Sequence, residues 1–240
     1  MSDVAWAIVP AAGRGTRFGG EVPKQYLSIA GQALVAHAID AVLADPRVRG
    51  VVVALAPDDD LWPRWGHRRG RPVVACTGGG ERADSVLAAI EALPADVPGD
   101  ALLLVHDAAR PNLDPGDLAR LLDAAFATPD GALLAAPVRD TLKRAGDDGR
   151  STGTEPREPL WRALTPQAFR RDLLREALLR ARREGVAATD EAMAVERTGL
   201  RPRLVEGRED NLKVTTPADL ALADYLLAAR IGARGPNGGA

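Results

Sequence analysis

Short apolar runs rich in strand-forming residues alternate along this chain with amphipathic stretches of helical spacing. The apolar runs cover residues 5–9, 50–55, 73–76, 101–105, 131–137 and 203–206. Such alternation predicts an α/β fold, in which a mainly parallel sheet is flanked by helices. The run at 101–105 is nearly continuous, which is typical of a strand buried on both faces.

Helix signals lie between these runs. The spacing predicts helices over 34–44, over 85–93 with Asp84 as N-cap, from Pro115 to Ala127 with Asp114 as N-cap, over 173–183 ending before Gly185, and from Pro217 onward. The chain has 240 residues, which fits one domain over 1–230. The Gly-rich tail at 231–240 is predicted to be disordered.

The segment from Arg139 to Pro159 interrupts this alternation of strand and helix signals, because it is polar and rich in turn formers. Asp147-Asp-Gly149 marks a hairpin tip within it, so we expect a protruding β-arm. A protrusion of this length is usually functional or a device for assembly. A surface loop is the alternative that composition alone would favour.

Bulk composition excludes several classes of protein. The formal charge is −2, which gives no general electrostatic attraction to nucleic acid or to an anionic membrane. The single cysteine, Cys76, allows no internal disulfide and is expected as a buried strand residue. No apolar run reaches the roughly 20 residues of a membrane span, and the N-terminus lacks a basic signal region, so we expect a cytoplasmic protein.

The first predicted strand leads into Pro10-Ala-Ala-Gly-Arg-Gly-Thr-Arg17. Small residues after a strand let backbone N–H groups approach an anion, although the glycine spacing matches neither a P-loop nor a dinucleotide fingerprint. Arg17 and Lys24 add two cations to this loop, an arrangement that suits phosphoryl transfer. Either cation taken alone would be interpreted as a solvated surface residue.

A second constellation is Leu104-Val-His-Asp107-Ala-Ala-Arg110-Pro111. Asp107 follows a buried strand, where an acid can hold a metal ion or a substrate hydroxyl. A structural ion pair between Asp107 and Arg110 is an equally good interpretation of the spacing. His106 alternates with Asp107 and is therefore expected to pack on the opposite side.

Together these segments resemble the 2-C-methyl-D-erythritol 4-phosphate cytidylyltransferase family over nearly the whole chain. Any one segment is weak evidence, but their order and spacing are specific. Besides the two constellations above, the matching segments are Pro23-Lys-Gln-Tyr26, Gly79-Gly-Glu-Arg-Ala-Asp-Ser85, Ala136-Pro-Val-Arg-Asp-Thr141, Leu164-Thr-Pro-Gln167, Thr189-Asp-Glu-Ala192, Val205-Glu-Gly-Arg208 and Asp210-Asn-Leu-Lys-Val214.

The resemblance implies a Rossmann-like fold of the nucleotidyltransferase type and a reaction in which an acceptor hydroxyl attacks the α-phosphate of CTP. It implies Arg17, Lys24 and Lys213 as catalytic cations, with Mg²⁺ held mainly by the CTP phosphates and Asp107 as the one possible protein ligand. The residues it implies for CTP binding are Ala11, Ala12, Gly13, Gly15, Gly79, Ser85 and Asp107.

The acceptor, methylerythritol phosphate, would meet Arg110, Thr141, Arg157, Thr165 and Thr189. Arg157 would come from a partner subunit, because members of the family dimerise through interlocking arms over 139–159. Thr189 could instead open a helix before Asp190 and Glu191. Many relatives carry Asp where this chain has Gly80, so a carboxylate contact to the nucleotide from that position is not expected.

Two other functions stay open at the level of sequence. Ribitol 5-phosphate cytidylyltransferase would share the nucleotide site and the arm and differ in the acceptor, although the threonine segments resemble the methylerythritol pattern more. A non-catalytic nucleotide-binding protein would be expected to have lost the transfer-site cations, and Arg17, Lys24 and Lys213 are all present.

Overall fold

The computed structural model describes residues 4–13 and 22–233. These residues form the predicted α/β sheet, with eight strands in the order β12-β8-β11-β7-β1-β4-β6-β5. The strands are β1 (Ala5–Pro10), β4 (Val48–Leu55), β5 (His67–Arg68), β6 (Arg71–Thr77), β7 (Leu102–Val105), β8 (Ala132–Pro137), β11 (Trp161–Arg170) and β12 (Arg203–Glu206). Within this sheet β5 and β11 run antiparallel to their neighbours, and the other strands run parallel to one another.

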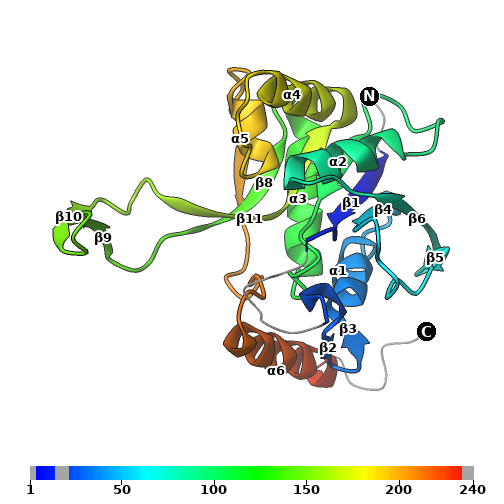
Figure 1. Cartoon of the computed structure of the whole chain (residues 1–240), viewed down its shortest axis with the longest axis horizontal. Helices are drawn as coiled ribbons and strands as arrows, with labels where there is room; N and C mark the ends of the chain where they lie inside the picture. Colours follow the sequence, from blue (N-terminus) through cyan, green and yellow to red (C-terminus); the bar gives the residue numbers. More distant parts are fainter. Residues whose placement is uncertain (1–3, 14–21, 234–240) are drawn as a thin grey trace.

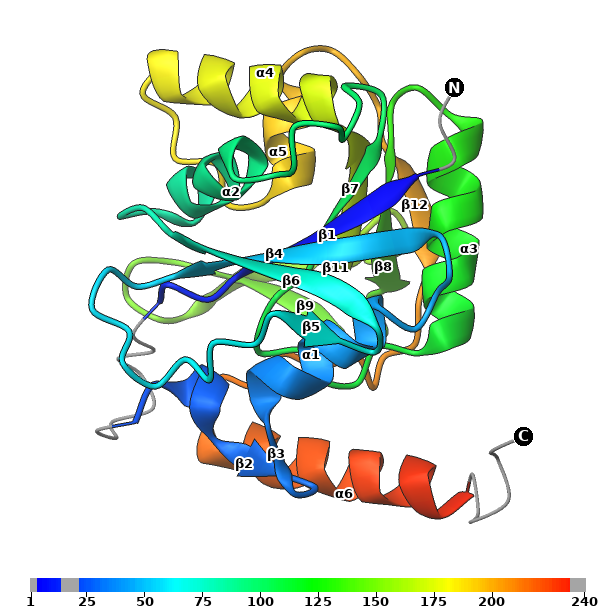
Figure 2. The same cartoon turned by 90° about the vertical axis from the view of Figure 1, so that its right-hand side faces the viewer.

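Helices cover both faces of the sheet, as Figure 2 shows. They are α1 (Leu34–Val42), α2 (Arg82–Glu91), α3 (Pro115–Ala127), α4 (Arg171–Arg183), α5 (Glu191–Glu196) and α6 (Pro217–Ala233), with a short 3-10 helix η2 (Lys24–Tyr26). Helices α1 and α3 pack on one face, and α2, α4 and α5 pack on the other. Helix α6 lies apart, against the small hairpin of β2 (Ser28–Ile29) and β3 (Gln32–Ala33).

The side chains of β7 are packed into the apolar cores on both faces of the sheet. Leu102 and Leu104 point into the core under α1 and α3, while Leu103 and Val105 point into the core under α2 and α4. All four side chains are fully buried. This two-sided burial follows from the period-two alternation of strand side chains, and it confirms the interpretation of 101–105 as a central strand.

The start of α2 differs from the prediction. The helix begins at Arg82, three residues before Ser85, and Asp84 lies inside its first turn. The carboxylate of Asp84 accepts a hydrogen bond from the backbone N–H of Glu81 over 3.4 Å. A reciprocal capping box therefore opens the helix, with Glu81 and not Asp84 as N-cap.

Strand β11 is a ten-residue element that the sequence did not predict. It fills the space between β7 and β8 and pairs antiparallel with both. Its pairing with β8 is irregular between Ala163 and Gln167, around Pro166. Proline is rare in central strands because it has no N–H to donate, so the local signal argued against a strand here.

The arm leaves the sheet at the ends of β8 and β11 and projects far from the rest of the chain (Figure 1). It carries a two-stranded hairpin of β9 (Leu142–Ala145) and β10 (Ser151–Glu155). Gly149 has a φ of 74°, and its N–H donates to the carbonyl of Gly146 over 2.9 Å. The predicted hairpin tip is thus present, at a position where glycine accommodates the left-handed backbone.

Among the described residues, no helix is long and apolar enough to cross a lipid bilayer. Cys76 lies on β6 as expected but is only half-buried, and burial raises the pKa of its thiol. The disordered tail was predicted for residues 231–240, but helix α6 continues to Ala233, so the first three of these residues are helical. The remaining residues, 234–240, lie outside the described part of the chain.

Candidate active site

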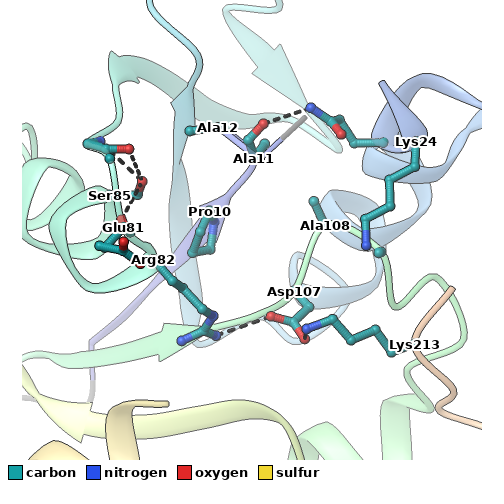
Figure 3. Close-up of a pocket in the computed structure, with 15 residues that line it drawn as sticks. Pro10, Ala11, Ala12, Lys24, Glu81, Arg82, Ser85, Asp107, Ala108 and Lys213 are labelled. Carbon is teal, nitrogen blue, oxygen red and sulfur yellow. Dashed lines mark hydrogen bonds and ion pairs between the residues drawn. The ribbon is translucent and has the colours of Figure 1, made fainter. Parts of the chain in front are cut away.

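A cavity of about 220 Å³ opens where β1 and β7 end, between the start of α2 and the helix η2 (Figure 3). The carboxyl ends of parallel strands are where open α/β sheets bind ligands. The cavity is lined by Pro10, Ala11, Ala12, Gly13, Lys24, Gln25, Gly79, Gly80, Glu81, Arg82, Ser85, Asp107, Ala108, Ala109 and Lys213. The structure therefore brings together both constellations that the sequence analysis singled out.

The turn after β1 is held through the backbone groups of Ala11. The N–H of Ala11 donates to the carbonyl of Ala54 over 2.7 Å. The carbonyl of Ala11 accepts a hydrogen bond from Nε2 of Gln25, a buried side chain on η2, over 2.8 Å. Gln25 was not predicted as a site residue, although it follows Lys24 directly. It ties the segment that carries Lys24 to the turn that starts at Pro10.

The opposite wall is the loop between β6 and α2. Oγ of Ser85 accepts a hydrogen bond from the N–H of Gly79 over 3.2 Å and lies 3.2 Å from the carbonyl oxygen of Glu81. A Cβ on Gly79 would lie 2.3 Å from Cβ of Asp84, so only glycine fits there. A Cβ on Gly80 would meet nothing within 4 Å. Ser85 thus orders the loop in addition to lining the cavity.

Two of the three predicted catalytic cations line the cavity. Nζ of Lys24 donates to the carbonyl of Val214 over 3.2 Å. Nζ of Lys213 lies 3.0 Å from Oδ2 of Asp107. Figure 3 shows the two ammonium groups on the same side of the cavity. The third cation, Arg17, and the predicted CTP-binding residue Gly15 lie outside the described residues.

Asp107 is surrounded by cations. Its Oδ1 lies 3.1 Å from Nη2 of Arg82, and its Oδ2 lies 3.3 Å from Nε of Arg110 as well as 3.0 Å from Lys213. Burial opposes ionisation of the carboxyl, but these three positive groups hold its pKa well below the usual range. The predicted ion pair with Arg110 is therefore present, and Asp107 also faces the cavity.

Arg82 and Glu191 are site residues that the sequence analysis did not single out. Arg82 is the first residue of α2, and it pairs with Asp107 through Nη2 and with Glu191 through Nη1. Glu191 opens α5 and is almost completely buried. Burial raises the pKa of Glu191, while the guanidinium of Arg82 favours its ionised form. Both residues stood inside matching segments, but only the fold shows that they meet.

A second cavity adjoins the first. Its lining includes three of the predicted acceptor residues, Arg110, Thr165 and Thr189. It shares Arg82, Asp107 and Lys213 with the first cavity. This shared group forms the boundary between the two spaces.

The threonines of the second cavity differ in their surroundings. Oγ1 of Thr165 is buried, accepts a hydrogen bond from the N–H of Asp107 over 3.1 Å, and contacts Nδ1 of His106 over 3.0 Å. Thr189 is exposed, and its hydroxyl contacts Sδ of Met193 over 3.4 Å. The N-cap of α5 is Asp190, so Thr189 does not open that helix.

Two predicted acceptor residues lie outside both cavities. Thr141 is exposed at the base of the arm, just before β9. Arg157 lies further along the arm, and its guanidinium donates to the carbonyl of Arg139. Neither residue lines the cavity that holds Arg110 and Thr165.

His106 packs away from the site, as predicted. It is fully buried, and Nε2 lies 2.9 Å from the carbonyl oxygen of Arg110. Burial lowers the pKa of His106 to about 4. A neutral, buried histidine of this kind supports the backbone from Asp107 to Arg110 and is not placed to act on a ligand.

Comparison with known proteins identifies the family of the chain. The family model described as 2-C-methyl-D-erythritol 4-phosphate cytidylyltransferase matches residues 5–229. A protein of that name from Stenotrophomonas maltophilia strain R551-3 is 61% identical over 232 residues, which cover 97% of this chain and 100% of the relative. One from Xanthomonas campestris pv. campestris strain 8004 is 63% identical over 230 residues, covering 96% and 87%.

Solved structures give the same result. A crystal structure of 4-diphosphocytidyl-2C-methyl-D-erythritol synthase superposes with a TM-score of 0.79 at 35% identity and covers 95% of this chain and 99% of its own. That of 2-C-methyl-D-erythritol 4-phosphate cytidylyltransferase from Thermus thermophilus has a TM-score of 0.74 at 35% identity, with coverage of 92% and 98%. The chain belongs to the 2-C-methyl-D-erythritol 4-phosphate cytidylyltransferase family.

Proposed function

We propose that this protein transfers the cytidylyl group of CTP to 2-C-methyl-D-erythritol 4-phosphate, giving 4-diphosphocytidyl-2-C-methyl-D-erythritol and pyrophosphate. The two adjoining cavities share Arg82, Asp107 and Lys213, so a nucleotide in one and a polyol phosphate in the other would meet beside these residues. The family of the chain supplies the identity of the two substrates.

In the proposed reaction an oxygen of the acceptor's phosphate, and not a hydroxyl as the resemblance was taken to imply, attacks the α-phosphate in line with the leaving pyrophosphate, because the product carries a diphosphate. A new bond joins the acceptor oxygen to phosphorus, and the bond from phosphorus to the pyrophosphate oxygen breaks. Lys24 and Lys213 would offset the charge that develops on the phosphate oxygens, together with Arg17. No covalent enzyme intermediate is needed.

For the nucleotide, the contacts favour some of the predicted groups over others. Both backbone groups of Ala11 already hold the turn after β1. We therefore assign base and ribose contacts to Ala12, Gly13 and the ordered loop of Gly79 and Ser85. We assign Asp107 to the ribose or to the acceptor hydroxyls.

We assign Mg²⁺ to the phosphates of CTP. Among the described residues, no three His, Cys, Asp or Glu side chains come together as a metal site. Asp107 is already paired with three cationic side chains. These residues do not form a magnesium site of their own, whereas the phosphates supply the oxygen ligands that Mg²⁺ prefers. Bound there, the ion would reduce the negative charge of the triphosphate.

The acceptor site is proposed to be completed by a second subunit. Arg110, Thr165 and Thr189 line the second cavity, but Thr141 and Arg157 lie on the projecting arm. A homodimer that exchanges arms would bring these two residues to the partner's cavity. A cytoplasmic location, expected from the sequence, is part of the same proposal.

The experiment that tests the proposed function is pyrophosphate release from CTP, measured with each of two acceptors. We expect release with methylerythritol phosphate and little release with ribitol 5-phosphate. Preference for ribitol 5-phosphate would identify the alternative acceptor. CTP binding without release of its pyrophosphate in the presence of either acceptor would instead indicate a non-catalytic nucleotide-binding protein.

A further inference from the structure

Glu191 is the most deeply buried acidic side chain near the two cavities, with 1% of its side chain exposed. Its Oε1 contacts Nη1 of Arg82, and within the described residues Oε2 has no hydrogen-bond partner. A buried carboxylate is costly unless it is paired. Glu191 does not line either cavity, so its position is not explained by a contact with substrate.

Arg82 transmits the effect of Glu191 to the site. Its guanidinium reaches from α2 to Glu191 on α5 with one nitrogen and to Asp107 after β7 with the other. A planar guanidinium held at two points has a fixed orientation. Arg110 is held in the same way, because its Nη1 donates to the carbonyl of Asn211 over 2.7 Å while Nε contacts Asp107.

Lys213 is different from the two arginines. Its side chain is 41% exposed, against 25% for Arg82 and 11% for Arg110. Its one ion pair in the described part of the chain is with Asp107. A flexible ammonium with a single partner can turn toward an incoming phosphate, whereas the anchored arginines cannot do so without breaking a second contact.

We infer that Glu191 is a positioning residue: it anchors Arg82, so that Arg82 and Arg110 hold the Asp107 carboxylate in place while Lys213 moves to the phosphates. Without Glu191, Arg82 could swing away from Asp107 or compete for the phosphates. The inference rests on the proposed function, because it names a residue that supports the same transfer site. Glu191 acts through Arg82 and not by touching substrate.

The test compares Glu191→Gln with Glu196→Gln in steady-state pyrophosphate release. Glu196 is on the same helix but exposed, and the same substitution there is expected to leave the kinetics unchanged. For Glu191→Gln we expect kcat to fall about tenfold or more while KM for CTP changes less than about threefold, because the anchor matters most once Lys213 has moved. A kcat within about twofold of the wild type would overturn the inference.

A double-mutant cycle with Arg82→Gln separates positioning from folding. Arg82→Gln alone leaves Glu191 buried without its cation and should lower Tm, and adding Glu191→Gln should recover part of that loss. We expect the second substitution to cause no further fall in kcat, since Glu191 acts only through Arg82. An equal fall in kcat in both backgrounds would overturn the inference.

Two further results are decisive. A double variant that stays unfolded would also overturn the inference, because the pair would then be needed for folding itself. A wild-type protein that releases no pyrophosphate from CTP with any acceptor would instead refute the proposed function. The wild-type control thus distinguishes the two failures.

Discussion

The phenol of Tyr26 donates a hydrogen bond to Oδ2 of Asp59 over 2.6 Å. Tyr26 ends the short helix η2 that also carries Lys24 and Gln25, and Asp59 lies in the loop after β4. Burial and the acceptor carboxylate together raise the pKa of Tyr26 well above its ordinary value, so the phenol stays a donor at neutral pH. This bond fixes the end of the segment that places Lys24 in the cavity.

Removing that hydrogen bond should loosen the Lys24 segment. For Tyr26→Phe we expect a loss of about 1 kcal/mol in the free energy of unfolding, the usual contribution of one such bond. We also expect a several-fold rise in KM for CTP, because Lys24 would be less well placed. Tyr225→Phe is the matched control, since Tyr225 is 70% exposed. An unchanged KM in Tyr26→Phe would contradict a positioning role for this bond.

Lys24 itself is expected to act in the transfer step. Lys24→Ala should lower turnover by about a hundredfold or more, as for other groups that stabilise charge in a transition state. Its effect on stability should be small, because Lys24 lines the cavity and is not part of the apolar core. Arg183→Ala removes an exposed cation on α4 and serves as the control. Near-normal turnover in Lys24→Ala would refute the assigned role.

The two neighbouring glycines of the β6–α2 loop should respond differently to the same substitution. Gly79→Ala places a Cβ 2.3 Å from Cβ of Asp84 and is expected to cost about 1–3 kcal/mol through overpacking. Gly80→Ala meets nothing within 4 Å and should change stability by less than about 0.5 kcal/mol. Thermal melts and KM for CTP check both variants. Equal effects at the two positions would show that the loop is not held as described.

His106 should make the protein less stable in mild acid. Its pKa is about 4 in the folded state, against an ordinary value near 6.5 in the unfolded chain. The unfolded chain therefore binds more protons between these values, so stability rises with pH through this window and is lost as pH falls. The loss contributed by His106 should approach about 3 kcal/mol near pH 4.

Denaturant titrations between pH 4 and 7 measure this effect. In His106→Gln the slope of unfolding free energy against pH should flatten, since the titrating group is gone. His67→Gln, at an exposed position, should keep the wild-type slope. If His106→Gln and the wild type gave the same slope, another group would have to be responsible.

Exchange of arms between subunits predicts complementation. Lys24→Ala disables the cavity of its own chain, and Arg157→Ala would disable the cavity of the partner. Each variant alone should be nearly inactive, but a refolded equal mixture should recover about a quarter of wild-type turnover, because half the dimers are mixed and each has one complete site. No recovery in a mixture that forms dimers would show that Arg157 serves its own chain.

Much of the sheet could be predicted from sequence because its buried strands are almost wholly apolar. The apolar runs at 101–105 and 131–137 were predicted as strands, and they form β7 and β8. Strand β11 could not be found this way, because Pro166 argues against a strand and polar residues at Arg162, Thr165 and Gln167 break the apolar run. Its formation depends on two partners, β7 and β8, that lie far from it along the chain.

In the candidate site, too, some features follow from local sequence and others only from the tertiary structure. By itself the sequence determined the residue types in each loop, the cations beside the glycine-rich turn and the family resemblance that these motifs carry. Only the tertiary structure decided that Arg82 and Glu191, 109 residues apart, meet beside Asp107. Local sequence specifies what a loop can bind, but the pairing of buried charges depends on which elements the packed sheet places next to one another.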